Sequence, residues 1–439
     1  MSDRRHLHLN LVGNDLNLHM GALAYEREHG GLEDRDAFTR LMEYGQFGDE
    51  GLFTAIFLGD VPGLAMSPAM DGGPAEPITA LTSMAARTKH VGLIATASTT
   101  FYDPYTLARL LASLDQASDG RAGFNAVTTA GDHFARNYSL EGHPDRETRY
   151  GRADEFLDVV TALWANRELR ADPDGATRFY ASPVDHDGER FQVAGALNVA
   201  PSRQGRPLIA QAGGSGTGIR VAAKHADMVF TNATTRDGAA AYRADLDKAL
   251  LEAGRQQDTV PAIPGLIPFI GRTAEEAEEK MRALDDYVPW DLLAPFALTQ
   301  FDIPLEFDDV NDPFPVEILP PPAEVEKTIN STFGNYVGLY NWVRDNPGVT
   351  VRDVAAHAIG RGGATHRKFV GSYDELVDDF ALWFEDGHVD GFNLMFPVGS
   401  LSIREFIDEV VPRLIDRGIY RSTPDDRPLR DRFREIANR

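Results

Sequence analysis

The sequence predicts an α/β protein whose chain closes into a (β/α)8 TIM barrel with insertions. Short apolar runs, typical of buried strands, alternate with longer runs whose apolar residues recur at helical spacing. This strand–helix unit repeats about eight times, which indicates parallel strands joined by helical crossovers. The chain has 439 residues, and α/β barrels of this length commonly form one domain. We therefore expect one barrel domain over residues 1–439, with excursions at about 167–207 and 287–325.

The strands and helices are predicted from the period of their apolar residues. Strands are predicted at 7–12, 52–58, 91–97, 123–127, 208–213, 227–231, 265–271 and 391–396. Helices with apolar residues at i, i+3 and i+4 are predicted at 34–50, 77–90, 104–118 and 152–164. Each such helix has one apolar face, which we expect to pack against the outside of the barrel.

Three segments do not follow the simple repeat. The polar segment 167–207 contains several prolines and glycines and predicts a small hairpin. Proline also forbids a continuous helix over 287–325, although this segment is rich in aromatic residues. It predicts a long loop that either covers the barrel mouth or clamps the barrel's side, and both interpretations stay open. The charged run RPLRDRFREIANR (427–439) predicts a final helix that packs on the surface or contacts another subunit.

Composition excludes several classes of function. A net charge of −24 argues against nucleic acid or an anionic membrane surface as a partner. The sequence contains no cysteine, which excludes disulfides, thiolate metal sites and cysteine nucleophiles. Histidines and carboxylates do not follow metal-ligand spacing, so no metal site is expected. The polar N-terminus and the lack of a long apolar run predict a cytoplasmic protein without a membrane span.

Catalytic residues of a (β/α)8 barrel come from the carboxyl ends of its strands. The polar residues at these ends are Asp60, Thr96, Thr99 and Asn125, and His19 follows the first strand. His366 precedes the last strand–helix repeat, so we treat it and His19 as candidate pocket residues. Without further context, a helix N-cap or a turn is the more ordinary role for Asp60.

Two further stretches predict a site for an anion. In QAGGSGTG (211–218), Gly214 lets the backbone approach a ligand, and Ser215 precedes a helix whose free N–H groups favour an anion. On this motif alone, simple helix capping by Ser215 is the favoured alternative. The loop after the strand 123–127 holds His143, Arg146 and Tyr150, which together look like one wall of an anionic ligand site.

Several ordered segments also carry a family pattern. The main ones are FLGD (57–60), TASTTFYDPYTLARLLASLDQASDGRAGFNAVTT (96–129), ARNYSLEGHPDRETRYGRADEFLDVVTALW (135–164), SRQGRPLIAQAGGSGTG (202–218) and FVGSYDELVDDFALWFEDGHVDGFNLMFP (369–397). In these segments the chain resembles the bacterial-luciferase-like flavin monooxygenases. The resemblance is to the branch of the nitrilotriacetate, dibenzothiophene-sulfone and long-chain alkane monooxygenases.

The resemblance implies a barrel that uses reduced FMN (FMNH2) as a co-substrate, supplied by a separate NAD(P)H:flavin reductase. It implies that O2 adds at the flavin C4a carbon and that the resulting peroxide oxidises a small organic substrate. A homodimer or homotetramer is also implied. Two neighbouring hypotheses stay open: a luciferase-like oxidoreductase that transfers hydride with a deazaflavin, and a flavin-binding protein without catalysis.

Site residues can be assigned by the same resemblance. Asp60 matches an acidic residue near the flavin, and Thr99, or Thr96 beside it, matches a strand-end hydroxyl. Asn125 and Val127 match the strand that lines the isoalloxazine ring.

The resemblance also assigns the phosphate end of the flavin. Tyr150 and Ser215, the latter next to Gly214, match phosphate ligands, and His143 keeps the first of two family histidines. The second histidine, four residues before the tyrosine, is replaced here by Arg146. The residues Leu23 and Ala24 stand where relatives carry a Trp-Arg pair near the substrate, so the resemblance does not imply a substrate.

Overall fold

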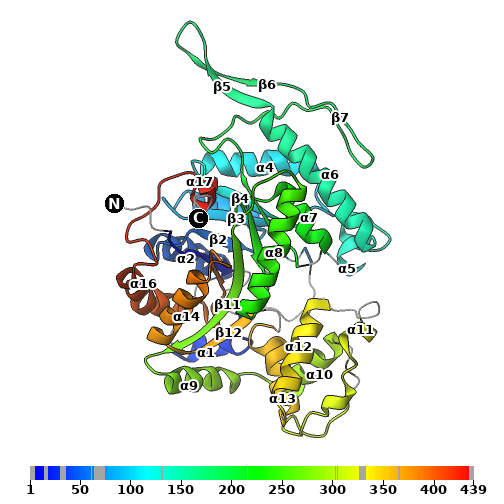
Figure 1. Ribbon diagram of the computed structural model, residues 1–439, viewed down its shortest axis with the longest axis vertical. Helices are drawn as coiled ribbons and strands as arrows, with labels where there is room; N and C mark the ends of the chain where they lie inside the picture. Colours follow the sequence, from blue (N-terminus) through cyan, green and yellow to red (C-terminus); the bar gives the residue numbers. More distant parts are fainter. Residues whose placement is uncertain are drawn as a thin grey trace.

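The protein was analysed as a computed structural model (Figure 1). The structure describes residues 5–13, 18–29, 36–60, 62–63, 75–129, 132–214, 216–301, 303, 305–325, 333–363 and 366–434. The predicted Ser215 lies outside these described residues. Within them, the structure contains no helix that is both long and apolar enough to cross a membrane.

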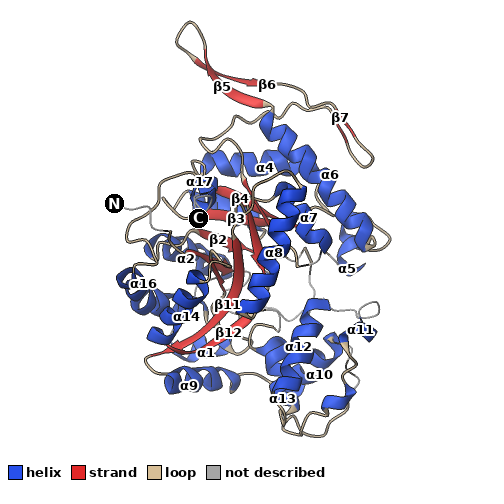
Figure 2. Ribbon diagram, in the orientation of Figure 1, coloured by secondary structure: helices blue, strands red, loops and turns tan. Residues whose placement is uncertain are grey.

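Eight parallel strands close into a ring, which confirms the predicted (β/α)8 barrel (Figure 2). In ring order they are β1 (His8–Gly13), β2 (Ala55–Leu58), β3 (Gly92–Ser98), β4 (Ala122–Val127), β9 (Leu208–Ala212), β10 (Met228–Thr231), β11 (Ala262–Gly271) and β13 (Gly391–Leu394). The ring closes where Gly391 of β13 pairs with His8 of β1. All eight predicted strands are present, and the seventh begins a few residues earlier than predicted.

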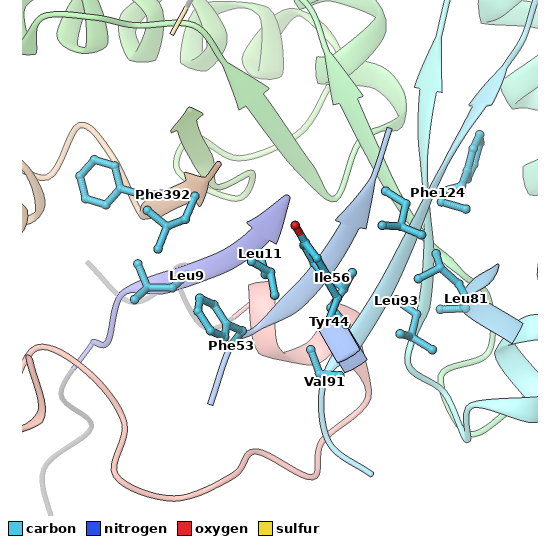
Figure 3. Close-up of a cluster of buried hydrophobic side chains, with 14 of the residues drawn as sticks. Leu9, Leu11, Tyr44, Phe53, Ile56, Leu81, Val91, Leu93, Phe124 and Phe392 are labelled. Atoms are coloured by element: carbon cyan, nitrogen blue, oxygen red, sulfur yellow. The ribbon is translucent and has the colours of Figure 1, made fainter. Parts of the chain in front are cut away.

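Helices surround the ring and bury their apolar faces on it. They are α1 (Ala22–His29), α2 (Ala37–Glu50), α3 (Pro77–Ala85), α4 (Pro104–Ala117), α5 (Asp132–Ala135) with η1 (Arg136–Tyr138), α6 (Arg146–Ala165), α7 (Gly216–His225), α8 (Arg236–Glu252), α9 (Ala274–Asp285), α14 (Tyr373–Glu385), and α15 (Gly399–Glu405), η4 (Phe406–Val410) and α16 (Val411–Arg417) in succession. Figure 3 shows part of this core, in which Leu9, Ile56 and Leu93 point outward from neighbouring strands. Alternate strand residues therefore face the helices, and the residues between them face the barrel interior.

Helix α6 begins six residues before its predicted start at 152. The Asp145 side chain caps it, because Oδ1 accepts a hydrogen bond from the backbone N–H of Thr148 at 2.8 Å. Arg146 is consequently the first residue of a helix and not part of a loop, which corrects the sequence-based expectation.

The C-terminal helix α17 (Leu429–Arg434) closes the amino end of the barrel. Leu429 and Phe433, which are at most 1% exposed, join the interior core with Ile94 and Leu208. The prediction that this charged helix packs on the surface is therefore wrong. Two apolar residues four positions apart form a narrow buried stripe, and the surrounding charges conceal it in the sequence.

Segment 167–207 forms two antiparallel hairpins. These are β5 (Arg167–Ala171) with β6 (Thr177–Ala181), and β7 (His186–Asp187) with β8 (Gln192–Val193). The β5–β6 hairpin projects well beyond the barrel and is seen at the top of Figure 1. Its base is held because Arg167 Nη1 donates hydrogen bonds to the carbonyls of Val199 and Ala200 at 2.7 and 3.2 Å.

A helical insertion lies between α9 and β12 (Arg367–Ser372), a strand that pairs with the end of β11. It contains α10 (Trp290–Gln300), η2 (Val316–Ile318), α11 (Pro322–Val325), α12 (Phe333–Asp345), α13 (Val351–Ala355) and the π-helix η3 (Ala356–Gly360). Its apolar residues form a hydrophobic core of their own, which runs from Val288 to Ala358. The expectation of a proline-broken loop is wrong for α10, which continues through Pro295. Proline removes only one backbone N–H donor, and the burial of neighbouring residues such as Ala294 and Leu298 offsets that loss.

The insertion contacts loops at the carboxyl end of the barrel. The backbone N–H of Met20, in the loop after β1, donates to Gly360 O at 2.9 Å. At the start of α12, Gly334 faces the side chain of Asn232, which directly follows β10. Figure 1 shows the insertion as a separate group of helices beside the barrel.

Candidate active site at the carboxyl end of the barrel

Two neighbouring strands bring Thr96 and Asn125 together inside the barrel. The two residues are partners in the β3–β4 register, and Asn125 Nδ2 donates to Thr96 Oγ1 at 3.2 Å. Asn125 Oδ1 is buried and has no hydrogen-bond partner among the described residues, and the same holds for Ser98 Oγ nearby. A buried acceptor without a partner costs about 1–3 kcal/mol. An N–H group of a bound ligand would remove this cost.

Thr99 fixes the ends of the same two strands. Its backbone N–H and its hydroxyl both donate to Val127 O, at 2.9 and 3.0 Å. Arg152 of α6 then donates from Nε to Thr99 O at 3.0 Å. Thr99 is therefore engaged in holding the strand ends together, whereas Thr96 points toward Asn125. The Val127 side chain is half-buried at the end of β4.

The N-termini of α6 and α7 both lie at this end of the barrel, because the helices follow the adjacent strands β4 and β9. Free N–H groups and the helix dipole favour an anion at such termini. Tyr150 is half-buried in the second turn of α6, and the exposed Arg146 has its guanidinium 5.9 Å from the centre of the Tyr150 ring. Gly214 is exposed just before α7, and a Cβ atom there would lie 3.3 Å from Asn232 Oδ1.

The arginine that contacts His143 is Arg149, which the sequence did not single out. Arg149 Nη1 lies 2.6 Å from His143 Nε2 and donates to Pro144 O at 2.8 Å. Burial lowers the pKa of Arg149, and the positive charge of Arg146 lowers it further. The sequence contains a signal that could have identified Arg149. It lies three residues after Arg146, so the two arginines are neighbours on one helix face.

On the opposite side of the ring, His366 fills the space above a glycine. A Cβ atom on Gly265 of β11 would lie 2.4 Å from His366 Nδ1, so only glycine leaves room for the ring. Burial, and then the charge of Lys368, lower the pKa of His366 to about 4. His366 is therefore neutral at physiological pH, and its Nδ1 is buried without a hydrogen-bond partner among the described residues.

Lys368 is a second residue that the sequence analysis missed. Its Nζ donates to Gly363 O at 2.6 Å, and burial, followed by the charge of Arg361, lowers its pKa to about 7. The two-residue spacing from His366, at the start of β12, places both side chains on one side of the extended chain. This spacing is the signal that could have identified Lys368.

His19 has both ring nitrogens engaged. Its Nε2 donates to Asp285 Oδ1 at 3.2 Å, and its Nδ1 accepts from the backbone N–H of Gly21 at 3.1 Å. Asp285 also binds Arg361, with Nε donating to Oδ1 at 3.1 Å. Burial alone would raise the pKa of Asp285, but its bonds to His19 and Arg361 hold the pKa below the usual range. His19 thus connects the loop after β1 to α9 and the insertion.

Asp60 follows β2 and is half-buried. Burial raises the pKa of Tyr138, and the negative charge of Asp60 raises it further, so the two residues lie close in space. The Tyr138 ring stacks on Phe101, with 4.5 Å between ring centres. Asp60 after β2 and Gly214 before α7 thus stand apart. The other described residues of the predicted site form three groups: one on β3 and β4, one around the start of α6, and one around β11 and the insertion.

Buried polar atoms without partners and two helix N-termini at the carboxyl end of a closed parallel barrel are typical of a TIM-barrel enzyme that binds an anionic ligand there. A sequence model of the family described as Luciferase-like monooxygenase matches residues 18–310. The chain belongs to this family, which confirms the resemblance found in the sequence, and it is a flavin-dependent monooxygenase.

Individual relatives are similar over most of the chain. Nitrilotriacetate monooxygenase component A from Aminobacter aminovorans is 35% identical over 369 residues, which cover 81% of this chain and 78% of that protein. The structure of EDTA monooxygenase from Chelativorans sp. BNC1 is 27% identical, with a TM-score of 0.76 and 98% of each chain covered. A riboflavin lyase solved with modified FMN and riboflavin is 25% identical, with a TM-score of 0.79 and 98% and 96% of the two chains covered.

Proposed function

We propose that this chain is the reduced-FMN-dependent oxygenase component of a two-component system and inserts one oxygen atom from O2 into a small organic substrate. A separate NAD(P)H:flavin reductase would supply the reduced flavin. The observation that carries the proposal is the buried, unpartnered Oδ1 of Asn125 near the carboxyl end of β4. The modified FMN bound to the related riboflavin lyase and the words "component A" in the name of the nitrilotriacetate relative support it.

The residues present fit a flavin. Asn125 Oδ1 can accept a hydrogen bond from an N–H group of the ring system, and Thr96 holds the amide in the orientation that leaves Oδ1 available. Tyr150 and the N-termini of α6 and α7 would bind the phosphate, together with Gly214 and Ser215. When bound, reduced FMN supplies the chemistry that activates O2. Asp60 and Val127 would border the ring.

His366 is proposed to act on the substrate. Because burial lowers its pKa to about 4, the imidazole is neutral and Nδ1 can accept a hydrogen bond or a proton from a substrate group. Burial against Phe230, whose ring centre is 5.4 Å away, keeps water from this nitrogen. His19 would be a positioning residue, since both its ring nitrogens are already bonded.

A substrate with carboxylate groups should be tested first. The names of two relatives specify nitrilotriacetate and EDTA, both of which are aminopolycarboxylates. In this chain, Lys368 lies near His366, and a bound carboxylate would stabilise its ammonium group, whose pKa is lowered to about 7 by burial and by the charge of Arg361.

The proposed homodimer or homotetramer also has a testable surface. Leu169 and Phe179 are partners in the β5–β6 register and are 52% and 38% exposed. An isolated two-stranded hairpin is marginally stable in water, so this hairpin would gain stability by packing on a second copy of the chain. Light scattering should report an oligomer that the double variant Leu169→Lys, Phe179→Lys shifts toward monomer. A monomeric parent protein would contradict this proposal.

The oxygenase proposal is tested with purified chain, FMN, NADH, a flavin reductase and 18O2. Mass spectrometry should detect one 18O atom in the product of at least one compound in a panel headed by aminopolycarboxylates. Omitting the reductase should abolish the product. If 18O is never incorporated and the chain does not bind reduced FMN, the proposal is wrong. If turnover proceeds equally well without O2 when a deazaflavin is supplied, the reaction is hydride transfer instead.

A further inference from the structure

A cavity of about 580 Å3 lies outside the barrel at its amino end, away from the candidate active site. It is bordered by the end of α7, by the residues just before β9 and β10, by the segment after α8, and by α17. Its charged lining residues are Arg206, Lys224, His225, Asp227, Arg255, Arg430 and Arg434. A cavity of this size lies within the range of about 300–1,000 Å3 that is usual for small-molecule sites.

The charge of this lining is opposite to that of the protein. Five lining residues are arginine or lysine, and among the described residues Asp227 is the only carboxylate that lines the cavity. The whole chain, in contrast, has a net charge of −24. A cluster of cations on such an acidic protein would attract anions to one place on its surface.

Asp227 does not neutralise the cluster. Arg206 binds it with two hydrogen bonds, at 2.8 and 3.0 Å, and Arg430 Nη2 lies 3.3 Å from the same carboxylate. Burial alone would raise the pKa of Asp227, but these two arginines keep it below the usual range. One carboxylate is therefore shared by two arginines, and a net positive charge remains before Arg255 is counted. Arg434 adds its guanidinium to the lining, although its Nη1 also lies 3.4 Å from the exposed carboxylate of Asp431.

Arg255 has donors that the described part of the protein does not use. Its Nη1 donates to the carbonyls of Ala223 and Ala226 at 3.0 and 2.9 Å, which fixes the guanidinium at the cavity. Its Nε and Nη2 make no hydrogen bond to any described residue. Burial lowers the pKa of Arg255, and repulsion from Arg206 and Arg434 lowers it further. The mutual repulsion of these arginines would be relieved by a bound anion.

Lys224 at the edge of the cavity is already neutralised. Its Nζ donates to Asp154 and Asp158 of α6 at 2.9 and 2.8 Å, and His225 Nε2 lies 2.7 Å from Asp154 Oδ1. The carboxylates of Asp154 and Asp158 and the imidazole of His225 are close enough to hold a metal ion. The ammonium group of Lys224, however, lies between the two carboxylates. The available positive charge is thus concentrated on the arginines.

We propose that this cavity binds a small molecule carrying two or more linked phosphate groups. Arginine guanidinium groups present paired N–H donors that match phosphate oxygens, and several arginines around one space favour a multiply charged ligand over a single carboxylate. Because Arg430 and Arg434 belong to α17, such a ligand would join the helix that closes the amino end of the barrel to α7 and α8. The bound state should therefore be more resistant to unfolding.

The test uses calorimetric titration of the whole protein with pyrophosphate. We expect saturable binding at one site per chain. The double variant Arg255→Gln, Arg434→Gln should weaken it at least about tenfold, because two guanidinium groups that could form charge-assisted hydrogen bonds to the phosphates are removed. The single variant Arg434→Gln, at a largely exposed side chain, should weaken it several-fold without disturbing the fold. The matched control is Arg282→Gln on α9, where the arginine is 64% exposed and, among the described residues, forms its ion pair with Glu278.

Further titrations identify the chemical class of the ligand and test whether it binds at the candidate active site instead. ADP that binds more tightly than pyrophosphate would show that a nucleoside contributes, and equal affinities would show that the phosphates suffice. FMN affinity should be unchanged by pyrophosphate and by the double variant. The proposal is wrong if pyrophosphate fails to bind at millimolar concentration. It is equally wrong if the Arg282→Gln control weakens binding as much as the double variant, or if pyrophosphate competes with FMN.

Discussion

The two ends of the barrel treat buried polar groups in different ways. Near the amino end, the buried guanidinium of Arg121 donates to Val91 O at 2.7 Å and to Ser118 O at 2.7 Å. At the carboxyl end, Asn125 Oδ1 and His366 Nδ1 are buried without partners among the described residues. Satisfied polar groups stabilise the fold, whereas unsatisfied ones lower its stability unless a ligand binds. The amino end also contains two such atoms, His8 Nδ1 and Arg432 Nη2, but there α17 fills the space and Phe433 packs on the His8 ring, with 4.6 Å between ring centres. The unpartnered atoms at the carboxyl end lie where a TIM barrel binds its ligand.

The largest expected effect is on stability and comes from the amino end. Phe433→Ala removes a ring that is 1% exposed and packs with Leu429 in the barrel interior. Truncating a buried phenylalanine costs about 3–5 kcal/mol, measured here as the free energy of unfolding in urea. The matched control Phe38→Ala, at a 42% exposed residue of α2, should cost less than about 1 kcal/mol. If both variants lose equal stability, α17 does not seal the barrel as described.

The next effect tests whether a buried carboxylate at the amino end costs stability. Burial raises the pKa of Asp115 from 3.8 to about 6, although Ser202 and Gln204 donate hydrogen bonds to it. A raised pKa means that the folded protein holds the proton more tightly than the unfolded chain. The contribution of Asp115 to stability is therefore full below pH 3.8 and is lost as the pH rises through about 6.

The variant Asp115→Asn removes this pH dependence. At about 1.4 kcal/mol for each pH unit, the difference between the two pKa values is worth on the order of 3 kcal/mol. The stability of the variant relative to the parent should therefore rise between pH 3.8 and about 6 and then stay constant. Melting temperatures of the parent and the variant across this pH range measure this change. A difference between the two proteins that does not vary with pH would contradict the raised pKa of Asp115.

The sequence predicted the barrel better than it predicted the site. Apolar runs are a local signal, so all eight strands and their order followed from the chain itself. The capping of α6 by Asp145 is also local, but the predicted start at 152 ignored it. The role of Phe433 could not be read locally, because only the closed barrel creates the space that this ring fills. The same limit applies to Asn125, whose partner Thr96 is 29 residues away along the chain.

At the carboxyl end, Asn125→Leu should separate binding from stability. Replacing the amide removes the buried acceptor that we propose for the flavin, so FMN affinity should fall about 10–100-fold. The free energy of unfolding without flavin should stay the same or increase, because an unpartnered buried oxygen is removed. Fluorescence titration with FMN and urea unfolding measure the two quantities. A variant that loses stability but keeps its FMN affinity would return Asn125 to a purely structural role.

The smallest effect concerns Arg146, which we propose stands in place of a second histidine of the family. Arg146 is exposed, with its guanidinium 5.9 Å from the centre of the Tyr150 ring, whereas Arg149 is half-buried and lies 2.6 Å from His143 Nε2. An exposed charge contributes at most about 1 kcal/mol. Arg146→Ala should therefore weaken FMN binding by no more than about fivefold.

Arg149→Ala is the informative partner of that variant. It removes the contact to His143 and the hydrogen bond to Pro144 O, so the loop before α6 is held less firmly. We expect a larger loss of FMN affinity than for Arg146→Ala, measured by the same fluorescence titration. If the order is reversed, Arg146 takes over the function of the missing histidine directly, and its exposed position in the flavin-free protein is not the one it adopts with ligand bound.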